Sequence, residues 1–231
     1  MVLDALQPLA DQSSLQERVY SELRRALLDD EVSSGQRVYE ADIAQRMGVS
    51  RVPVREAVRR LQQDGLLEVR ARGGVYVASI SAEEVDDVYR LRGAVEGVAA
   101  AMAAERASDA ELAAIGEVID QLSDGKQRRR SLSTADHSTA VRLADEFHRS
   151  IYAASHCDRV HLLLEPLYAQ LMRFRKQTLS LPHRARDAEK GHRQVYEALL
   201  TRNPAEAERV MRAHIESARV VLLDHLASQN P

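Results

Sequence analysis

Apolar residues recur at the spacing of an α-helix through almost the whole of this 231-residue chain. Residues 54–61 illustrate the spacing, with apolar side chains at offsets of three, four and seven that share one helical face. Only residues 67–69 and 75–77 alternate with a period of two, on either side of a glycine-containing turn at 71–74, which is typical of a two-stranded hairpin. The chain is therefore predicted to be mainly α, with one β-hairpin.

The position of this hairpin divides the chain into parts. Three short predicted helices precede it, the first opened by a capping box at Ser14 and Glu17. A second capping box at Ser81 and Glu84 follows it and marks a domain boundary at about residue 80. We expect a flexible arm over 1–13, a first domain of three helices and the hairpin over 14–80, and an all-α helical bundle of about six helices over 81–231. Those helices are predicted at about 82–107, 109–123, 135–155, 158–180, 184–201 and 204–228, with a basic loop at 124–131.

Charge and cysteine content limit the class of protein. The net charge is −3, so DNA binding would require a local basic patch rather than a generally basic surface. A single cysteine excludes an intramolecular disulfide framework. The sequence contains neither a secretory signal pattern nor an apolar run of membrane-spanning length. These features predict a cytoplasmic protein with no membrane partner.

The first three helices and the hairpin have the order of a winged helix-turn-helix. On the third helix, Arg51, Arg55 and Arg59 form a stripe about 110° away from the apolar face, at about 100° per residue. Such arginines are usually a solvated surface on an isolated helix. Between a glycine turn and a glycine-tipped wing, however, they favour a helix that enters the major groove, where a guanidinium can bond guanine.

Three histidines lie on otherwise apolar helical faces in the second half of the chain. They are His148, His192 and His214, each on a different predicted helix. One such histidine is usually a hydrogen-bonded core residue, whereas three unpaired imidazoles would be costly to bury together. A divalent metal would satisfy all three, and we expect zinc, with nickel and manganese as alternatives.

The sequence resembles a known family of regulators. Residues 48–61, GVSRVPVREAVRRL, followed by Asp64-Gly65-Leu66, are similar to the DNA-binding signature of the GntR family. Residues 34–40 and 74–77 are similar to its flanking elements. The all-helical remainder resembles the FadR-like branch, with similar segments at 91–96, 146–151, 192–195 and 211–214. Its six predicted helices suggest the shorter, VanR-like form of the FCD sensing domain.

This resemblance implies particular DNA contacts. Arginines matching Arg51 and Arg55 contact bases in the family, and wing glycines enter the minor groove. Ala41 stands where some relatives have a further DNA-contacting arginine. With Arg59 added from the stripe, the expected DNA-binding residues are Ser50, Arg51, Val52, Arg55, Arg59 and Gly73.

The resemblance also implies a ligand site in the helical domain. An aspartate one turn before the first histidine usually completes the family's metal site, but Ala144 occupies that position here, and Asp145 is the substitute candidate. Arg92 is the expected ligand of a small carboxylate effector, with Arg173 and Arg175 as weaker candidates. A surface ion pair between Arg92 and Glu96 is the simpler alternative.

These inferences predict a homodimeric transcription repressor that binds a palindromic operator and responds to a small organic acid beside the metal. The main alternative is a metal-dependent helical-bundle enzyme, since Asp145-x-x-His148 and Glu189-x-x-His192 imitate carboxylate-bundle ligation. A purely architectural DNA binder is a third possibility, but it would leave the helical domain without a purpose.

Overall fold

The computed structural model describes residues 15–28, 32–70, 73–128, 134–181 and 184–229, and between 124 and 137 it describes the backbone only. The chain divides into two compact units, one ending at Ser79 and the other beginning at Ile80. The predicted arm over 1–13 lies outside the described residues.

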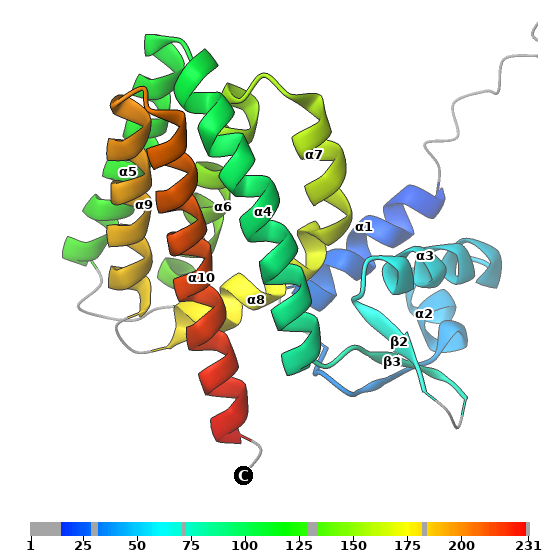
Figure 1. The fold of residues 1–231 in the computed structure, drawn as a ribbon. Coiled ribbons are helices and arrows are strands. Elements are labelled where there is room, and N and C mark those ends of the chain that lie inside the picture. The colour runs from blue at the N-terminus through cyan, green and yellow to red at the C-terminus, as the bar shows by residue number, and fades with distance from the viewer. Residues whose placement is uncertain (1–14, 29–31, 71–72, 129–133, 182–183, 230–231) are drawn as a thin grey trace, which may run out of the picture. The chain divides into compact units, whose positions relative to one another are not determined.

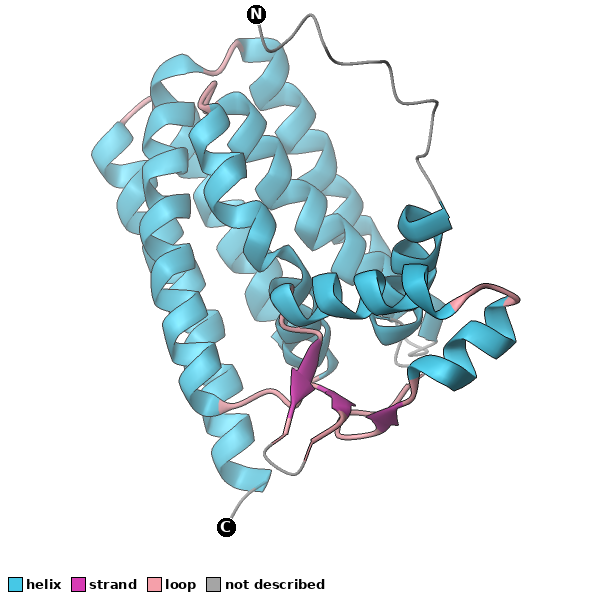
Figure 2. Ribbon diagram, turned by 90° about the vertical axis from the view of Figure 1, so that its right-hand side faces the viewer, coloured by secondary structure: helices cyan, strands magenta, loops and turns pink. Residues whose placement is uncertain are grey.

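In its described residues, the first unit contains three helices and a small antiparallel sheet (Figure 2), whose strand order is β1-β3-β2. The sequence predicted only the hairpin of β2 and β3. β1 has two residues, which pair with Val75 and Tyr76, and so short a strand carries no periodic signal. The elements are α1 (Leu15–Leu28), β1 (Arg37–Val38), α2 (Glu40–Met47), α3 (Arg51–Gln63), β2 (Leu67–Val69) and β3 (Val75–Val77).

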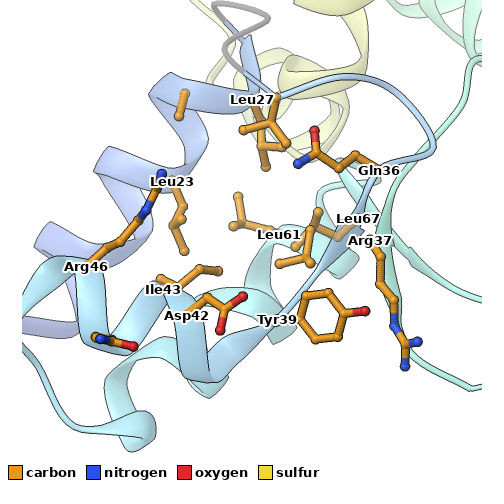
Figure 3. Close-up of a pocket in the computed structure, with 14 residues that line it drawn as sticks. Leu23, Leu27, Gln36, Arg37, Tyr39, Asp42, Ile43, Arg46, Leu61 and Leu67 are labelled. Atoms are coloured by element: carbon orange, nitrogen blue, oxygen red, sulfur yellow. The ribbon is translucent and has the colours of Figure 1, made fainter.

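Contacts between α1 and α3 fix the orientation of α3. The hydroxyl of Tyr20 donates a hydrogen bond to Asp64 at 2.5 Å, and burial together with this bond raises the pKa of Tyr20 to about 12. Arg60 forms an ion pair with Glu17 and lies over the Tyr20 ring, 3.8 Å from its centroid. A pocket of about 800 Å³ opens beside these helices, lined by side chains of α1, α2 and β1 (Figure 3).

The second unit is all helical within the described residues (Figure 1). One helix was predicted over 158–180, but the structure divides it at Pro166, which lacks the N–H that a continuous helix needs. The loop predicted from 124 was also wrong in part, since α5 continues to Arg128. The elements are α4 (Ala82–Arg106), α5 (Asp109–Arg128), α6 (Thr134–Ala154), α7 (Asp158–Leu164), η2 (Glu165–Leu167), α8 (Tyr168–Ser180), α9 (Arg184–Leu200) and α10 (Pro204–Gln229).

Helices α4 and α10 lie side by side (Figure 1). Small residues of α4 allow this close approach, because a Cβ on Gly93 would lie 3.6 Å from Ile215 and one on Gly97 would lie 2.9 Å from Arg212. The predicted capping box at Ser81 is present, with its hydroxyl accepting a hydrogen bond from the Glu84 N–H at 3.0 Å. Within the described ranges, no helix combines the length and apolarity required to cross a membrane.

Candidate functional site

Helix α3 presents a sharply divided surface. Val54, Ala57, Val58 and Leu61 are each at most 2% exposed, as their spacing predicted. The arginine stripe, Arg51, Arg55 and Arg59, is exposed on the other side of the helix.

The three stripe arginines have no carboxylate partner among the described residues. Arg60, next to them in sequence, differs because Glu17 and Tyr20 hold its guanidinium against α1. The stripe therefore keeps its donors available to a partner outside the unit, whereas Arg60 serves the packing of the unit itself.

The N-terminus of α3 is also open. Ser50 occupies the cap position in an extended conformation, and its hydroxyl accepts no hydrogen bond from the helix. Val52, the second residue of α3, is 54% exposed, which is unusual for a valine on a helix with so complete an apolar face. A hydroxyl, an apolar side chain and free N–H groups at one helix end suit phosphate and thymine methyl contacts.

The turn between β2 and β3 has a backbone that requires glycine. Gly73 has φ +76° and Gly74 has φ +98°, a region that L side chains rarely adopt. The N–H of Gly73 donates to the Arg70 carbonyl at 2.8 Å and closes the turn. Nothing lies within 4 Å of a Cβ placed on Gly73, so the wing tip is open to a partner.

The three predicted histidines meet inside the second unit. His148 on α6, His192 on α9 and His214 on α10 are 1%, 3% and 8% exposed, and one ring nitrogen from each lies within 4.8 Å of the others. The ring centroids of His192 and His214 are 4.6 Å apart. α9 can approach α10 this closely because residue 191 is glycine: a Cβ there would overlap with Nδ1 of His214.

All three imidazoles are neutral in this environment. Burial lowers the pKa of His148 to about 4, although the Glu96 carboxylate opposes this shift. Burial and the neighbouring imidazoles lower the pKa values of His192 and His214 well below the ordinary value. Neutral imidazoles are the form that binds metals, and Nδ1 of His192 is buried without a hydrogen-bond partner. The donor set therefore fits a divalent metal.

A buried carboxylate and guanidinium orient His148. Nδ1 of His148 lies 2.6 Å from Glu96, and Nε of Arg92 donates to the same carboxylate. A second Arg92 nitrogen lies 3.1 Å from Nε2 of His148. Arg92 is 3% exposed and Glu96 is fully buried, so the surface ion pair considered from the sequence is wrong. The pair instead holds a single imidazole tautomer, with Nδ1 protonated.

A small pocket adjoins the histidine cluster. Its cavity is about 30 Å³, and its lining includes the cluster together with Tyr89, Arg92, Arg175 and Arg184. Arg175 donates to Asp145 at 2.7 Å. Arg173, which the resemblance suggested alongside Arg92, is half-buried and does not line this pocket.

The structure does not bring Asp145 into the histidine cluster. Its carboxylate accepts hydrogen bonds from Arg175, Arg149 and Tyr168 instead. Glu189 similarly accepts a bond from Ser123 at 3.0 Å. The two acid–histidine pairs that imitated carboxylate-bundle ligation therefore do not assemble as a ligand set.

Sequence reasoning missed two features of this site. Glu96 was read only as an ion-pair partner, and its spacing of four from Arg92 gave no sign that both are buried. No sequence pattern marks Arg184. It is the first residue of α9, and helical periodicity says little about a terminal residue.

Comparison with known proteins gives the family. Residues 15–77 match the family "Bacterial regulatory proteins, gntR family", and residues 87–217 match the FCD domain. The chain is 27% identical to the HTH-type transcriptional regulator YdhC of Bacillus subtilis over 84% of its length and 85% of that protein. It is 26% identical to the HTH-type transcriptional repressor RspR of Escherichia coli over 87% of its length and 85% of that protein.

A solved structure supports the same architecture. The Escherichia coli protein McbR/YncC has 20% sequence identity and a TM-score of 0.72, over 92% of this chain and 99% of that one. The predicted fold class, a winged helix-turn-helix followed by an all-α domain, is thus confirmed, and the relatives are regulators rather than enzymes. The chain belongs to the GntR family and is a DNA-binding transcriptional regulator with a C-terminal FCD domain.

Proposed function

We propose that this regulator is a repressor whose FCD domain holds a divalent metal at His148, His192 and His214 and responds to a small organic acid bound beside it. The observation that carries the proposal is the cluster of three buried, neutral imidazoles with a ring nitrogen of each within 4.8 Å of the others. Such a cluster without a ligand leaves buried polar nitrogens unsatisfied, as Nδ1 of His192 is.

Zinc is the metal we propose, with nickel and manganese as alternatives. Three imidazoles and one open position are a frequent zinc ligand set. When bound, the metal supplies a positive charge that attracts a carboxylate. Glu96 keeps Nδ1 of His148 protonated and leaves Nε2 as the donor. A metal held by Nε2 would take the place of the Arg92 contact there, and Glu96 would still neutralise Arg92.

The basic residues around the cluster support an acidic effector. Arg92 and Arg175 both line the small pocket with the three histidines. Their guanidinium groups bind carboxylates in a bidentate manner, and a dry setting strengthens such contacts. An acid switches DNA binding only if it binds the two conformations of the regulator with different affinity. The metal can then be structural while the acid is the signal.

We propose that DNA is bound through Ser50, Arg51, Val52, Arg55, Arg59 and Gly73. Their support is the exposed, unpaired stripe on α3 and the open wing tip. Arginines of the stripe would read guanine in the major groove, and the wing would lie against the minor groove.

A homodimer on a palindromic operator completes the proposal. Helices α4 and α7, which pack against each other, expose large apolar side chains that a second copy would cover. These are Leu91, Val98, Leu162 and Leu163, each between 41% and 62% exposed. The repressor role rests on likeness to RspR, which is itself named a repressor. In a bacterium such a protein acts in the cytoplasm.

The test combines mass spectrometry with DNA binding. Native mass spectrometry of the purified protein should give a dimer with one metal per chain. Selection from random DNA should yield a palindrome, and electrophoretic mobility shifts should then change when organic acids are added. His192→Ala should lose both the metal and the acid response, whereas the exposed control His156→Ala should keep both. Full metal content in His192→Ala would refute the proposed site.

A further inference from the structure

Arg184 is a buried cation that forms no ion pair with a carboxylate among the described residues; Asp187, one turn further along α9, interacts with it only through its charge. The residue is 4% exposed, and its Nε has no hydrogen-bond partner in the described part of the chain. No ion pair with Arg184 occurs among the described residues either. The side chain lines the same small pocket as the three histidines.

The other two arginines of this pocket differ from Arg184. Glu96 neutralises Arg92, and Asp145 neutralises Arg175 at 2.7 Å. Arg184 is therefore the one arginine among the described residues of this pocket whose positive charge has no ion pair, besides any charge that a metal would bring. The positive charge of Arg184 acts on other residues of the site. It repels the positive charge of Arg92, and it lowers the pKa of His214.

An unpaired buried guanidinium is costly. Burial lowers the pKa of Arg184, and the opposing effects of Tyr89 and Asp187 do not make up for the loss of hydration around the charge. A group of this kind destabilises a fold unless a ligand compensates it, and buried charges without partners are rare outside functional sites.

We propose that Arg184 binds a second anionic group of the effector, so that the effector is a compound with at least two acidic groups, such as a short dicarboxylate. This inference rests on the proposed function, in which the first acidic group lies at the histidine cluster. Arg184 and His192 lie on one helix, eight residues or about 12 Å apart along its axis. Because the long Arg184 side chain lines the pocket, its guanidinium can lie closer to the His192 ring than the two backbone positions do. A small molecule can then contact both groups.

The size of the cavity favours a short molecule. At about 30 Å³ it admits a water molecule or two, so any organic acid displaces lining side chains. A short diacid requires the least displacement while it still reaches both the histidine cluster and Arg184.

The test compares diacids with monoacids of equal length. Zinc-loaded protein is titrated calorimetrically with oxalate, malonate, succinate and glutarate, each beside the monocarboxylate of the same chain length. At least one diacid should bind more tightly than its monoacid. Arg184→Gln should weaken that diacid by about 10- to 100-fold and leave the monoacid almost unchanged. Arg186→Gln, an exposed change on the same helix, should alter neither.

A second measurement separates ligand binding from a structural role. Without ligand, Arg184→Gln should raise the melting temperature, because it removes an unpaired buried charge. A structural arginine would instead lower the melting temperature when it is replaced. A lower melting temperature, an unchanged diacid affinity, or no preference of the wild type for any diacid would overturn the inference.

The same measurements distinguish failure of the metal proposal from failure of the role proposed for Arg184. If the wild type retains no zinc but a diacid still binds through Arg184, the metal proposal fails and the role of Arg184 stands. If zinc is retained and no diacid is preferred, the metal site stands and the role of Arg184 fails.

Discussion

Nδ1 of His148 lies 2.6 Å from a carboxylate oxygen of Glu96, and both side chains are almost completely buried. This contact joins α6 to α4 and fixes which imidazole nitrogen can bind a metal. Burial alone would raise the pKa of Glu96, but the charge of Arg92 and the hydrogen bonds from Arg92 and His148 hold it below its ordinary value. The carboxylate is thus ionised and acts as the acceptor at the centre of the site.

Glu96→Gln should weaken metal binding without removing a metal ligand. The amide cannot hold the protonated imidazole as the carboxylate does, so zinc affinity should fall by about 10- to 100-fold. Arg92 also loses its buried partner, which should cost about 3–5 kcal/mol of the free energy of unfolding. Competition with a fluorescent zinc chelator and urea denaturation measure the two effects. Glu105→Gln, exposed on the same helix, is the control, and equal zinc affinity in both variants would exclude this role.

Metal-free protein should lose stability as the pH falls below about 6.5. The folded-state pKa values of His148, His192 and His214 lie below that of a free imidazole, so the unfolded chain binds protons that the folded chain does not. Each such histidine lowers the free energy of unfolding by about 1.4 kcal/mol per pH unit in this window. For His148 the loss continues to about pH 4, where the folded form also titrates.

Urea denaturation in the presence of a chelator, at a series of pH values from 7.5 to 5, measures this dependence. The variant His214→Asn should lose the contribution of one histidine to the slope of the free energy of unfolding against pH. A stability that is flat or that rises as the pH falls would contradict the neutral, buried state of these imidazoles.

Gly191→Ala should disrupt the metal site through His214. The new methyl group overlaps with Nδ1 of that imidazole, so the ring must move and zinc affinity should fall by at least about tenfold. Gly93→Ala is the matched control, because its Cβ would lie 3.6 Å from Ile215, an ordinary contact. Alanine there should even stabilise α4, by up to about 1 kcal/mol. Metal analysis and thermal unfolding of the two variants provide the comparison. If both variants bind zinc equally well, α9 can shift enough to accommodate the methyl group, and the prediction is wrong.

Arg55→Ala should reduce sequence discrimination by the regulator. Loss of one bidentate arginine contact to guanine typically costs about 1–3 kcal/mol of specific binding. Arg25→Ala removes the same charge from α1, where Arg25 pairs with Glu22, and should lower affinity little. Binding to the selected operator and to a scrambled duplex at one salt concentration gives the discrimination of each variant. If Arg55→Ala discriminates as well as the wild type, Arg55 does not read bases.

Helix α3 could be predicted closely from the sequence. Val54 and Leu61 are buried, and Arg55 and Arg59 are exposed, as their spacing on α3 required. The reason is that a helix places its faces by a local rule, so its buried side follows from the positions of the apolar residues. The same rule explains why His148, His192 and His214 could be expected to point inward.

The ends of the helices could be predicted only where a local sequence motif marks them. Ser81 and Glu84 marked the start of α4, because a capping box is a local interaction. The helix predicted over 158–180 was wrong because its apolar pattern continues past Pro166 and only the missing N–H ends α7.

Only the tertiary structure decided which polar groups meet. Arg92 and Glu96 look like a surface pair in sequence, yet the packing of α4 against α6 and α10 buries both and sets them on His148. Asp145 lies one residue from the position expected of a ligand and pairs with Arg175 instead. The sequence alone determined which faces of the helices turn inward, since that is a local property. Which inward side chains touch depends on the distances and rotations between helices far apart in the chain, and these are set by the packing of the whole domain.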